Sequence, residues 1–315
     1  MKIRNDLGMP DHAFKAICKL QQRSAAPELD HIGVGSLLGA PLTRFLFTRY
    51  FDDIEFSVAD TMNAIQGQLG HLLFDKVESR TMTEVSLEAS MDGFLIRGRL
   101  DYYDPDTLTI GDTKFRQVNS VLARNIAKDD YLERQLNVYR WLAHQNGMIA
   151  EQLQGDIYIN GWVRYKAYDS FNYPKAPYVK IKVPLWDMKF VESFIRERLA
   201  AHDLPAIRLL RDIRKGFETG PAAMKRLDAL MLDIPICTEK ERFTAKSKWA
   251  VMKEGQKKAV KLFESREDAV ASGLISSVKH SLVERKGGNI KCMYYCDVKP
   301  FCPYKKIVDN KEAVE

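Results

Sequence analysis

Several patterns that define common classes of protein are missing from this sequence. No segment approaches the roughly 18 to 20 consecutive apolar residues that a membrane span requires, and residues 1–20 contain no continuous apolar run typical of a secretory signal. No Gly-x4-Gly-Lys-Ser/Thr loop occurs, so the chain carries no P-loop ATPase of its own. The tight Cys-x2-Cys pairs of zinc ribbons are also absent. We therefore expect a cytoplasmic protein without a membrane segment.

Charge and length set only broad limits on function. The 48 Lys and Arg residues exceed the 42 Asp and Glu residues by six in a chain of 315 residues, 45% of which are hydrophobic. This mild positive excess permits a polyanionic partner such as nucleic acid but does not require one. The length suits one large domain, or a core with an appendage.

Two strand-like segments predict a β-hairpin with acidic residues at its edge. Residues 94–103 and 108–115 have strand character, and Asp104-Pro105-Asp106 between them has turn chemistry. Folding one strand back on the other would bring Asp101 beside Asp112. The hairpin therefore predicts two neighbouring carboxylates.

Lys114 adds an ammonium group to this pair of carboxylates. Because side chains alternate along a strand, Asp112 and Lys114 share one face. Hard divalent cations take oxygen ligands, and a lysine can steady an attacking water or a developing negative charge, so the group suits a cation next to a phosphodiester. The Asp/Glu-x-Lys triplet alone is uninformative, because it recurs at Asp187, Glu284, Asp297 and Asp309.

Hydrophobic periodicity predicts helices over residues 58–78 and 130–145, on either side of the hairpin. In the second helix Gln135 and Tyr139 are four positions apart and project from the same face. There an amide and a phenol could contact a substrate or orient Lys114. The alternative is a tyrosine packed on the core and a glutamine in solvent.

These motifs resemble the PD-(D/E)XK nuclease superfamily in its RecB-like branch. The likeness rests on Gly98-Arg99-Leu100-Asp101, Gly111-Asp112-Thr113-Lys114 and Gln135-x3-Tyr139. Gly67-Gln68-Leu69-Gly70-His71 matches the helix in which that branch carries a metal-binding histidine, and Ser36-Leu37-Leu38-Gly39-Ala40-Pro41 resembles the opening of phage-encoded members. Leu100 stands where the superfamily's name implies proline, a substitution common in the RecB-like branch.

The resemblance implies an α/β fold with a restriction-endonuclease-like core, in which helices flank a mixed sheet. It implies a helical N-terminal portion (1–57), the core (58–232) and a C-terminal cysteine-bearing segment (233–315). The implied activity is metal-dependent hydrolysis of DNA, as an exonuclease on ends or single strands in phage recombination or replication. The implied metal ligands for one or two Mg²⁺ or Mn²⁺ ions are His71, Asp101, Asp112 and the backbone carbonyl of Thr113, and the implied catalytic residues are Asp101, Asp112, Lys114, Gln135 and Tyr139.

Three of the five cysteines lie close together as Cys292-x3-Cys296-x5-Cys302. Stable disulfides are not expected in the cytosol, so this clustering indicates a metal site, with unligated buried thiols as the alternative. Cys237 is our choice of fourth ligand because the string that it opens resembles the phage nuclease group, and Cys18 is the rival. Four thiolates suit a [4Fe-4S] cluster or zinc, and the resemblance favours the iron–sulfur cluster.

Two further segments combine basic residues with apolar ones. In residues 155–184 aromatic side chains alternate with basic ones, which predicts a hairpin that stacks bases and grips phosphates, or simply has packed and solvated faces. Residues 246–272 predict a small basic module of strand, turn, strand and a helix opened by Ser265. This module is either a second DNA contact or a solvated surface.

A different class of function remains open from the sequence. The chain could be a catalytically silent DNA-binding or assembly protein on a nuclease fold, and RNA could replace DNA as the substrate. Since the chain has no P-loop, any unwinding must come from a separate helicase or recombination protein.

Overall fold

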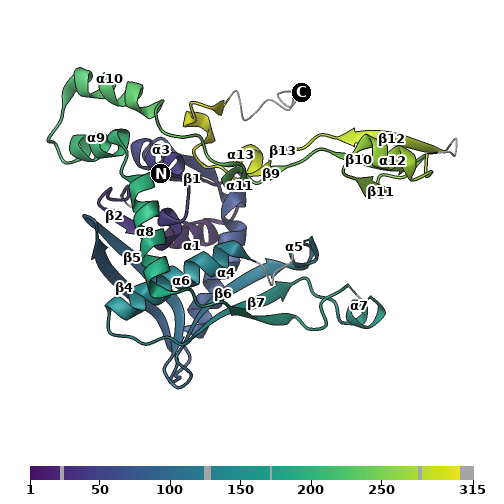
Figure 1. Cartoon of the computed structure of the whole chain (residues 1–315), viewed down its shortest axis with the longest axis horizontal. Coiled ribbons are helices and arrows are strands. Elements are labelled where there is room, and N and C mark those ends of the chain that lie inside the picture. Colours follow the sequence, from purple (N-terminus) through teal and green to yellow (C-terminus); the bar gives the residue numbers. More distant parts are fainter. Residues whose placement is uncertain (22–24, 124–128, 171, 276–278, 306–315) are drawn as a thin grey trace. The chain divides into compact units, whose positions relative to one another are not determined.

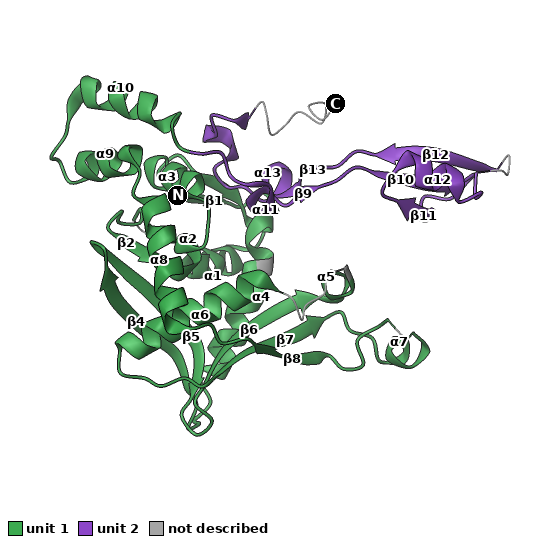
Figure 2. Ribbon diagram, viewed as in Figure 1, with its two compact units in different colours: residues 1–234 green, residues 235–315 purple. Residues whose placement is uncertain are grey.

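The structure is a computed structural model that describes residues 1–21, 25–123, 129–170, 172–275 and 279–305. Its residues form two compact units, Met1–Ile234 and Pro235–Glu315 (Figure 2). The boundary that we expected from the sequence lies at residue 233. No helix within the described ranges is long and apolar enough to cross a membrane.

The first unit is a mixed α/β structure (Figure 1). Its strands are β1 (Lys2–Arg4), β2 (His31–Gly33), β3 (Glu55–Ser57), β4 (Met82–Met91), β5 (Phe94–Asp104), β6 (Thr109–Gln117), β7 (Gln152–Asn160) and β8 (Tyr178–Val183). Its helices are α1 (Asp11–Gln21), α2 (Val34–Leu37), α3 (Pro41–Arg49), α4 (Val58–Phe74), α5 (Val118–Ala123), α6 (Asp130–Gln145), α7 (Arg164–Asp169), α8 (Met188–His202), α9 (Pro205–Arg214) and α10 (Gly220–Met231). The expectation of a mixed sheet flanked by helices is met.

The main sheet has six strands in the order β2-β5-β6-β7-β8, with β4 paired to β5. Strands β2 and β5 are parallel, as are β6 and β7, whereas the other pairs are antiparallel. The predicted hairpin is present, with Tyr102 opposite Gly111. In its turn, the Asp104 carboxylate accepts a hydrogen bond from the Asp106 amide at 3.0 Å, which is the Asx-turn chemistry that the sequence indicated.

Helices α6 and α4 cover opposite faces of this sheet. A Cβ atom placed on Gly155 of β7 would lie 2.5 Å from Leu132 of α6, so the two elements are in close contact. Three residues further along β7, the ring of Tyr158 contacts Phe74 of α4, with centroids 5.6 Å apart. Because neighbouring side chains of a strand point to opposite faces, α6 and α4 lie on different sides.

The hydrophobic core lies on the α6 side of the sheet. Leu136 and Trp141 of α6 are almost fully buried there, together with Ile195 of α8. Each such side chain contributes about 1.5 to 3 kcal/mol relative to exposure. The core therefore fixes α6, and with it Gln135 and Tyr139, against the strands.

The structure corrects three expectations for the first unit. Residues 1–57 are not only helical, because β2 joins the main sheet. The helix expected over 58–78 ends at Phe74. Within the expected hairpin 155–184, β7 and β8 do pair, but residues 164–169 form helix α7. Gly161 turns the chain after β7 with a φ of +73°, and the Lys175 ammonium donates to the Ala167 carbonyl at 2.7 Å, which satisfies the end of α7.

The second unit consists of short elements. They are α11 (Glu239–Arg242), β9 (Thr244–Ala245), β10 (Lys248–Lys253), β11 (Ala259–Phe263), α12 (Arg266–Ala271), β12 (His280–Arg285), β13 (Gly288–Asn289), α13 (Ile290–Tyr294) and the 3₁₀ helix η2 (Lys299–Phe301). The basic module contains the predicted strands and helix, and Ser265 caps α12 by accepting from the Asp268 amide. Strand β12 pairs with β10 and extends the module beyond residue 272.

His202, the last residue of α8, is fully buried. Its Nε2 lies 3.3 Å from the carbonyl oxygen of Leu37. Burial, together with the positive charges of Arg44 and Arg198, lowers the pKa of His202 to about 3. The folded protein thus holds this histidine neutral.

We expect acid to destabilise the fold through His202. The folded-state pKa of about 3 lies below the ordinary value of 6.5, so the stabilisation is complete above about pH 6.5 and is lost as the pH falls toward 3. His202→Gln keeps a hydrogen-bond donor for Leu37 without a titrating ring. Urea unfolding at about pH 7 and about pH 5 should show a smaller loss of stability for this variant than for wild type. Equal losses would contradict this assignment.

Candidate active site

Three side chains from different elements converge beside the hairpin. His71 lies on α4, Glu84 on β4 and Asp101 on β5, and one ligand atom of each lies within 4.8 Å of the other two. His71 Nδ1 is 3.2 Å from Glu84 Oε1, and His71 Nε2 is 3.9 Å from Asp101 Oδ2. The sequence predicted His71 and Asp101, and a metal-binding histidine needs a carboxylate or carbonyl to hold its second ring nitrogen. Glu84 is placed to do so, but sequence reasoning did not find it.

The backbone of β4 is strained at Glu84. Thr83 pairs with Tyr102 and Val85 with Leu100, so Glu84 and Asp101 fall opposite each other. Glu84 has a φ of +51°, a left-handed conformation that costs free energy in a residue with a side chain. Strain of this kind is typical of functional positions. In this backbone conformation the Glu84 carboxylate points toward His71.

A hydrogen bond from the next strand holds the Asp101 carboxylate. The backbone N–H of Thr113 donates to Asp101 Oδ2 at 2.6 Å. Thr113 itself is buried. The Asp101 carboxylate therefore contacts the backbone of Thr113, the residue whose carbonyl is the further metal ligand predicted from the sequence.

Asp112 and Lys114 form a buried ion pair next to this group. The Asp112 side chain is 1% exposed, and Lys114 Nζ donates to its Oδ1 at 2.7 Å and lies 2.7 Å from its Oδ2. Burial raises the pKa of Asp112 to about 6; Lys114 opposes this rise and Asp101 adds to it. Among the described residues, Asp112 is not part of the group within 4.8 Å. We predicted that Asp112 and Lys114 share one face, and they form this ion pair. In the group with His71 and Asp101, however, Glu84 takes the place that we expected for Asp112.

Gln135 and Tyr139 of α6 are both buried, each 9% exposed. Burial raises the pKa of Tyr139 to about 12, and its side-chain hydrogen bond with Gln135 opposes this rise. A Cβ atom on Gly98 would lie 2.6 Å from the Tyr139 ring, so the glycine of the predicted motif lets Tyr139 approach β5. Within the described part of the chain, the Oε1 of Gln135 has no hydrogen-bond partner.

A cleft of about 310 Å³ opens on the α4 side of the sheet. Its lining includes the three converging residues but neither Asp112 nor the two α6 residues. The lining residues are His71, Phe74, Thr81, Thr83, Glu84, Asp101, Tyr102, Thr113, Gln154, Asp156, Tyr158 and Tyr178. The candidate site therefore has two parts. The group of His71, Glu84 and Asp101 is open to the cleft, and the ion pair of Asp112 and Lys114 is buried on β6.

Asp156 is a second residue that sequence reasoning missed. It is 5% exposed and accepts hydrogen bonds from the hydroxyl groups of Tyr102, at 2.5 Å, and Tyr178. Gln154 Nε2 also donates to it, at 3.0 Å. The sequence signal was the polar alternation at Gln154, Asp156 and Tyr158 within an otherwise apolar strand.

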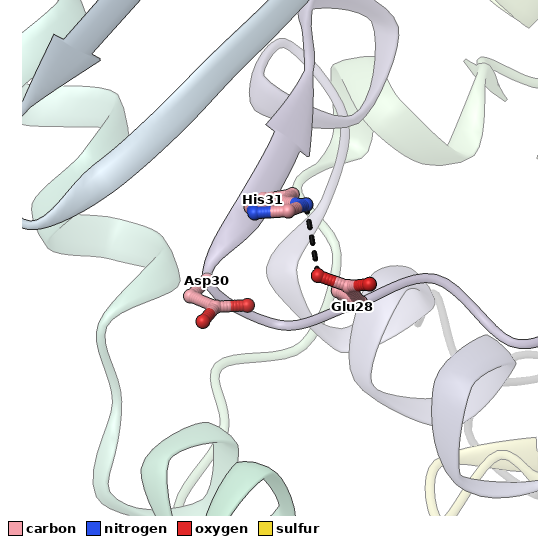
Figure 3. A group of neighbouring side chains, drawn as sticks. All are labelled: Glu28, Asp30 and His31. Carbon is pink, nitrogen blue, oxygen red and sulfur yellow. Dashed lines mark ion pairs between the residues drawn. The ribbon is translucent and has the colours of Figure 1, made fainter.

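Glu28, Asp30 and His31 form another group of possible ligands (Figure 3). Glu28 Oε2 lies 2.9 Å from His31 Nδ1, as Figure 3 shows. Asp30 is held by Lys215 at 2.7 Å, and this hydrogen bond lowers the pKa of Asp30. None of the three lines the cleft. We therefore regard the group of His71, Glu84 and Asp101 as the better candidate for a cation.

In the second unit the structure brings four cysteines together. Cys237 precedes α11, Cys292 lies on α13, and Cys296 and Cys302 flank η2. Burial, together with neighbouring Cys296, Cys237 and Cys302, raises the pKa of Cys292 to about 11. Cys18 lies on α1 of the first unit.

No protein-family model matches the chain, and none of the curated proteins matches it. Among solved structures, SSO0001 is 18% identical with a TM-score of 0.42, covering 61% of this chain and 86% of that one. A phage-related exonuclease from Haemophilus somnus 129PT is 17% identical with a TM-score of 0.28, covering 72% and 86%. Similarities this weak leave the function to be inferred from the residues of the chain itself.

We expect Glu84→Ala to weaken Mn²⁺ binding by about tenfold or more, because it removes a carboxylate that contacts the histidine. Isothermal titration calorimetry on the purified protein measures this affinity. Glu28→Ala is the matched control, since it breaks the equivalent pair with His31. Unchanged affinity in Glu84→Ala, or an equal loss in Glu28→Ala, would show that the cation binds elsewhere.

Proposed function

We propose that the chain is a divalent-metal-dependent deoxyribonuclease with a PD-(D/E)XK-type core of the RecB-like branch. Its substrates are DNA ends or single strands, and the context is phage recombination or replication. The observation that carries this proposal is the convergence of His71, Glu84 and Asp101 beside the ion pair of Asp112 and Lys114. A weak likeness to a phage-related exonuclease accords with it but carries no weight.

The donor set fits a hard divalent cation. One imidazole nitrogen and carboxylate oxygens from two strands suit Mg²⁺ or Mn²⁺. His71, Glu84 and Asp101 would hold the ion, with Asp112 and the carbonyl of Thr113 as the further ligands predicted from the sequence. The ion would supply Lewis acidity to the scissile phosphate.

The surrounding residues orient these groups. Glu84 holds Nδ1 of His71, which leaves Nε2 toward Asp101, and the Thr113 amide fixes the Asp101 carboxylate. Lys114 would position the attacking water and stabilise the negative charge that grows on the phosphate oxygens. Its contact with both oxygens of Asp112 keeps the ammonium at a defined place until a substrate enters.

The burial of Gln135 and Tyr139 helps to choose between the two roles that the sequence predicted for them. Both side chains pack behind β5 and β6, and Tyr139 experiences the charges of Asp112 and Asp101. This position supports the second of the two predicted roles, which is to orient Lys114. The unpartnered Oε1 of Gln135 is a buried acceptor available to Lys114.

We further propose that Cys237, Cys292, Cys296 and Cys302 hold a [4Fe-4S] cluster. Thiolates about 2.3 Å from a tetrahedral zinc lie about 3.8 Å apart. No three of these cysteines, all of which are described, have sulfurs that lie within 4.8 Å of one another. A larger iron–sulfur core suits this wider spacing better than zinc. The cluster would close the long loop between residues 237 and 302 and so stabilise the second unit.

The nuclease proposal predicts loss of cleavage in single variants. Lys114→Ala and Asp101→Ala should each lower the rate by about 100-fold or more, because each removes charge stabilisation or a metal ligand. The assay is degradation of end-labelled single- and double-stranded DNA with Mn²⁺ or Mg²⁺. Lys189→Ala is the control, because Lys189 belongs to the same Asp-x-Lys pattern but is exposed at the start of α8.

Two outcomes would contradict the nuclease proposal. Wild-type rates in either variant with excess Mg²⁺ would remove the assigned roles. A gel shift in EDTA, without cleavage under any divalent ion, would favour the catalytically silent DNA-binding protein. Parallel digestion of matched RNA shows which nucleic acid is preferred.

The cluster proposal predicts that anaerobically purified protein is brown, with broad visible absorbance from cysteine-ligated iron and sulfide. Cys237→Ser should lose this colour and its iron, whereas Cys18→Ser should keep both. The reverse pattern would assign the fourth ligand to Cys18. Colourless protein with one bound zinc would exclude the cluster.

A further inference from the structure

Beyond the acidic group, the cleft has an aromatic wall. Phe74, Tyr158 and Tyr178 line the cleft, and together with Phe115, which contacts Phe74 and Tyr158, they form a continuous set of rings, here called the aromatic row. Phe115 stacks on Tyr158 with centroids 5.3 Å apart and planes 22° apart, and Tyr158 contacts Tyr178 at 5.3 Å. At its other end, the ring of Phe115 lies 6.4 Å from that of His71. The aromatic row therefore begins beside the candidate cation ligands.

Strand register explains how the aromatic row forms. Phe115 of β6 is the partner of Tyr158 of β7, which is in turn the partner of Tyr178 of β8. Directly paired residues share a face of a sheet, so the rings run across three strands. Gly70 of α4 makes room for them, because a Cβ atom there would lie 2.1 Å from the Phe115 ring.

Asp156 fixes the outer end of the aromatic row. The hydroxyl of Tyr178 donates to this buried carboxylate, which also accepts from Tyr102 and Gln154. A buried polar group without partners is costly, so these three donors stabilise the Asp156 side chain in this position. With its hydroxyl held, Tyr178 keeps its ring in the cleft wall while 37% of the residue remains exposed.

The chemistry of the cleft indicates the kind of ligand. A volume of about 310 Å³ is at the lower end of ligand sites. It suits one nucleotide rather than a base pair. The carboxylates of Glu84, Asp101 and Asp156 repel a phosphate that arrives without a cation, whereas the rings offer a flat apolar face for any base.

We propose that the aromatic row, with Tyr178 fixed by Asp156, binds an unpaired nucleobase of a nucleic-acid strand. A phosphate of the same strand lies at the group of His71, Glu84 and Asp101. The inference rests on the proposed nuclease function and narrows its substrate to a single strand or a frayed end. Tyr158 and Tyr178 supply the stacking surface, and Asp156 acts as a positioning residue. The preference for unpaired bases arises because a paired base cannot leave its stack without cost.

The test uses the fluorescence of 2-aminopurine at the end of an oligonucleotide. Full-length protein is titrated in Ca²⁺, and stacking on a ring quenches the signal. We expect strong quenching with a single strand and little with a blunt duplex of the same sequence. Tyr178→Ala should remove the quenching and weaken binding by roughly tenfold or more.

Three further variants separate stacking from folding. Tyr178→Phe keeps the ring but loses the hydroxyl, so quenching should persist at reduced affinity. Asp156→Asn keeps the shape of the side chain and should affect quenching in the same way as Tyr178→Phe. Tyr168→Ala removes a tyrosine that is 80% exposed on α7, outside the cleft, and should behave as wild type.

The outcomes distinguish this inference from the nuclease proposal. Equal quenching in Tyr178→Ala and wild type, or equal quenching of blunt duplex and single strand, would overturn the stacking site. If the wild type cleaves DNA and Tyr178→Ala changes neither quenching nor strand preference, only this inference fails. If the wild type quenches as expected but cleaves nothing with any divalent ion, the stacking site stands and the nuclease proposal fails.

Discussion

The candidate site depends on the hydrogen bond between the Thr113 amide and the Asp101 carboxylate. Strands β5 and β6 pair only from Tyr102 to Asp104 on one side and from Thr109 to Gly111 on the other. Beyond that point a side-chain carboxylate accepts the backbone N–H that a regular ladder would give to a carbonyl. A buried amide without an acceptor would be costly, so the carboxylate must stay in place. This constraint holds Asp101 at the opening between two strands, where His71 and Glu84 reach it.

Several features of the candidate site lower the stability of the fold, as is typical of functional positions. Glu84 adopts a left-handed conformation that glycine would accept more readily. Asp112 is almost fully buried, and a buried ion pair repays little of its desolvation cost. Carboxylates at positions 84 and 101 face each other across β4 and β5. A fold selected for stability alone would place apolar residues at these positions.

The sequence predicted the features that depend on local chemistry. The Asp-Pro-Asp turn, the hairpin and the helix Asp130–Gln145 follow from turn residues and periodicity, and the structure contains all three. Glu84 was invisible because its role depends on register with Asp101 and on a left-handed φ, neither of which a single strand reveals. The role of Asp156 was also invisible, because it depends on how the strands that carry Asp156, Tyr178 and Tyr102 are arranged in the sheet. Helix α7 was missed because its tyrosines at positions 165 and 168 gave an aromatic pattern that we interpreted as a strand.

Charge is distributed unevenly around the cleft. This asymmetry affects how a nucleic-acid strand would enter. The floor carries the carboxylates of Glu84, Asp101 and Asp156, so an anionic backbone gains nothing there until a cation neutralises them. On β8, Lys180 and Lys182 follow Tyr178 at alternate positions, so they share its face, and both are exposed. In the proposed nuclease, phosphates would find positive charge at these lysines and bases would find the aromatic row, and only a phosphate that reaches a bound cation would enter the acidic group. Under this proposal, metal binding and nucleic-acid binding would be coupled, because each supplies the charge that the other requires.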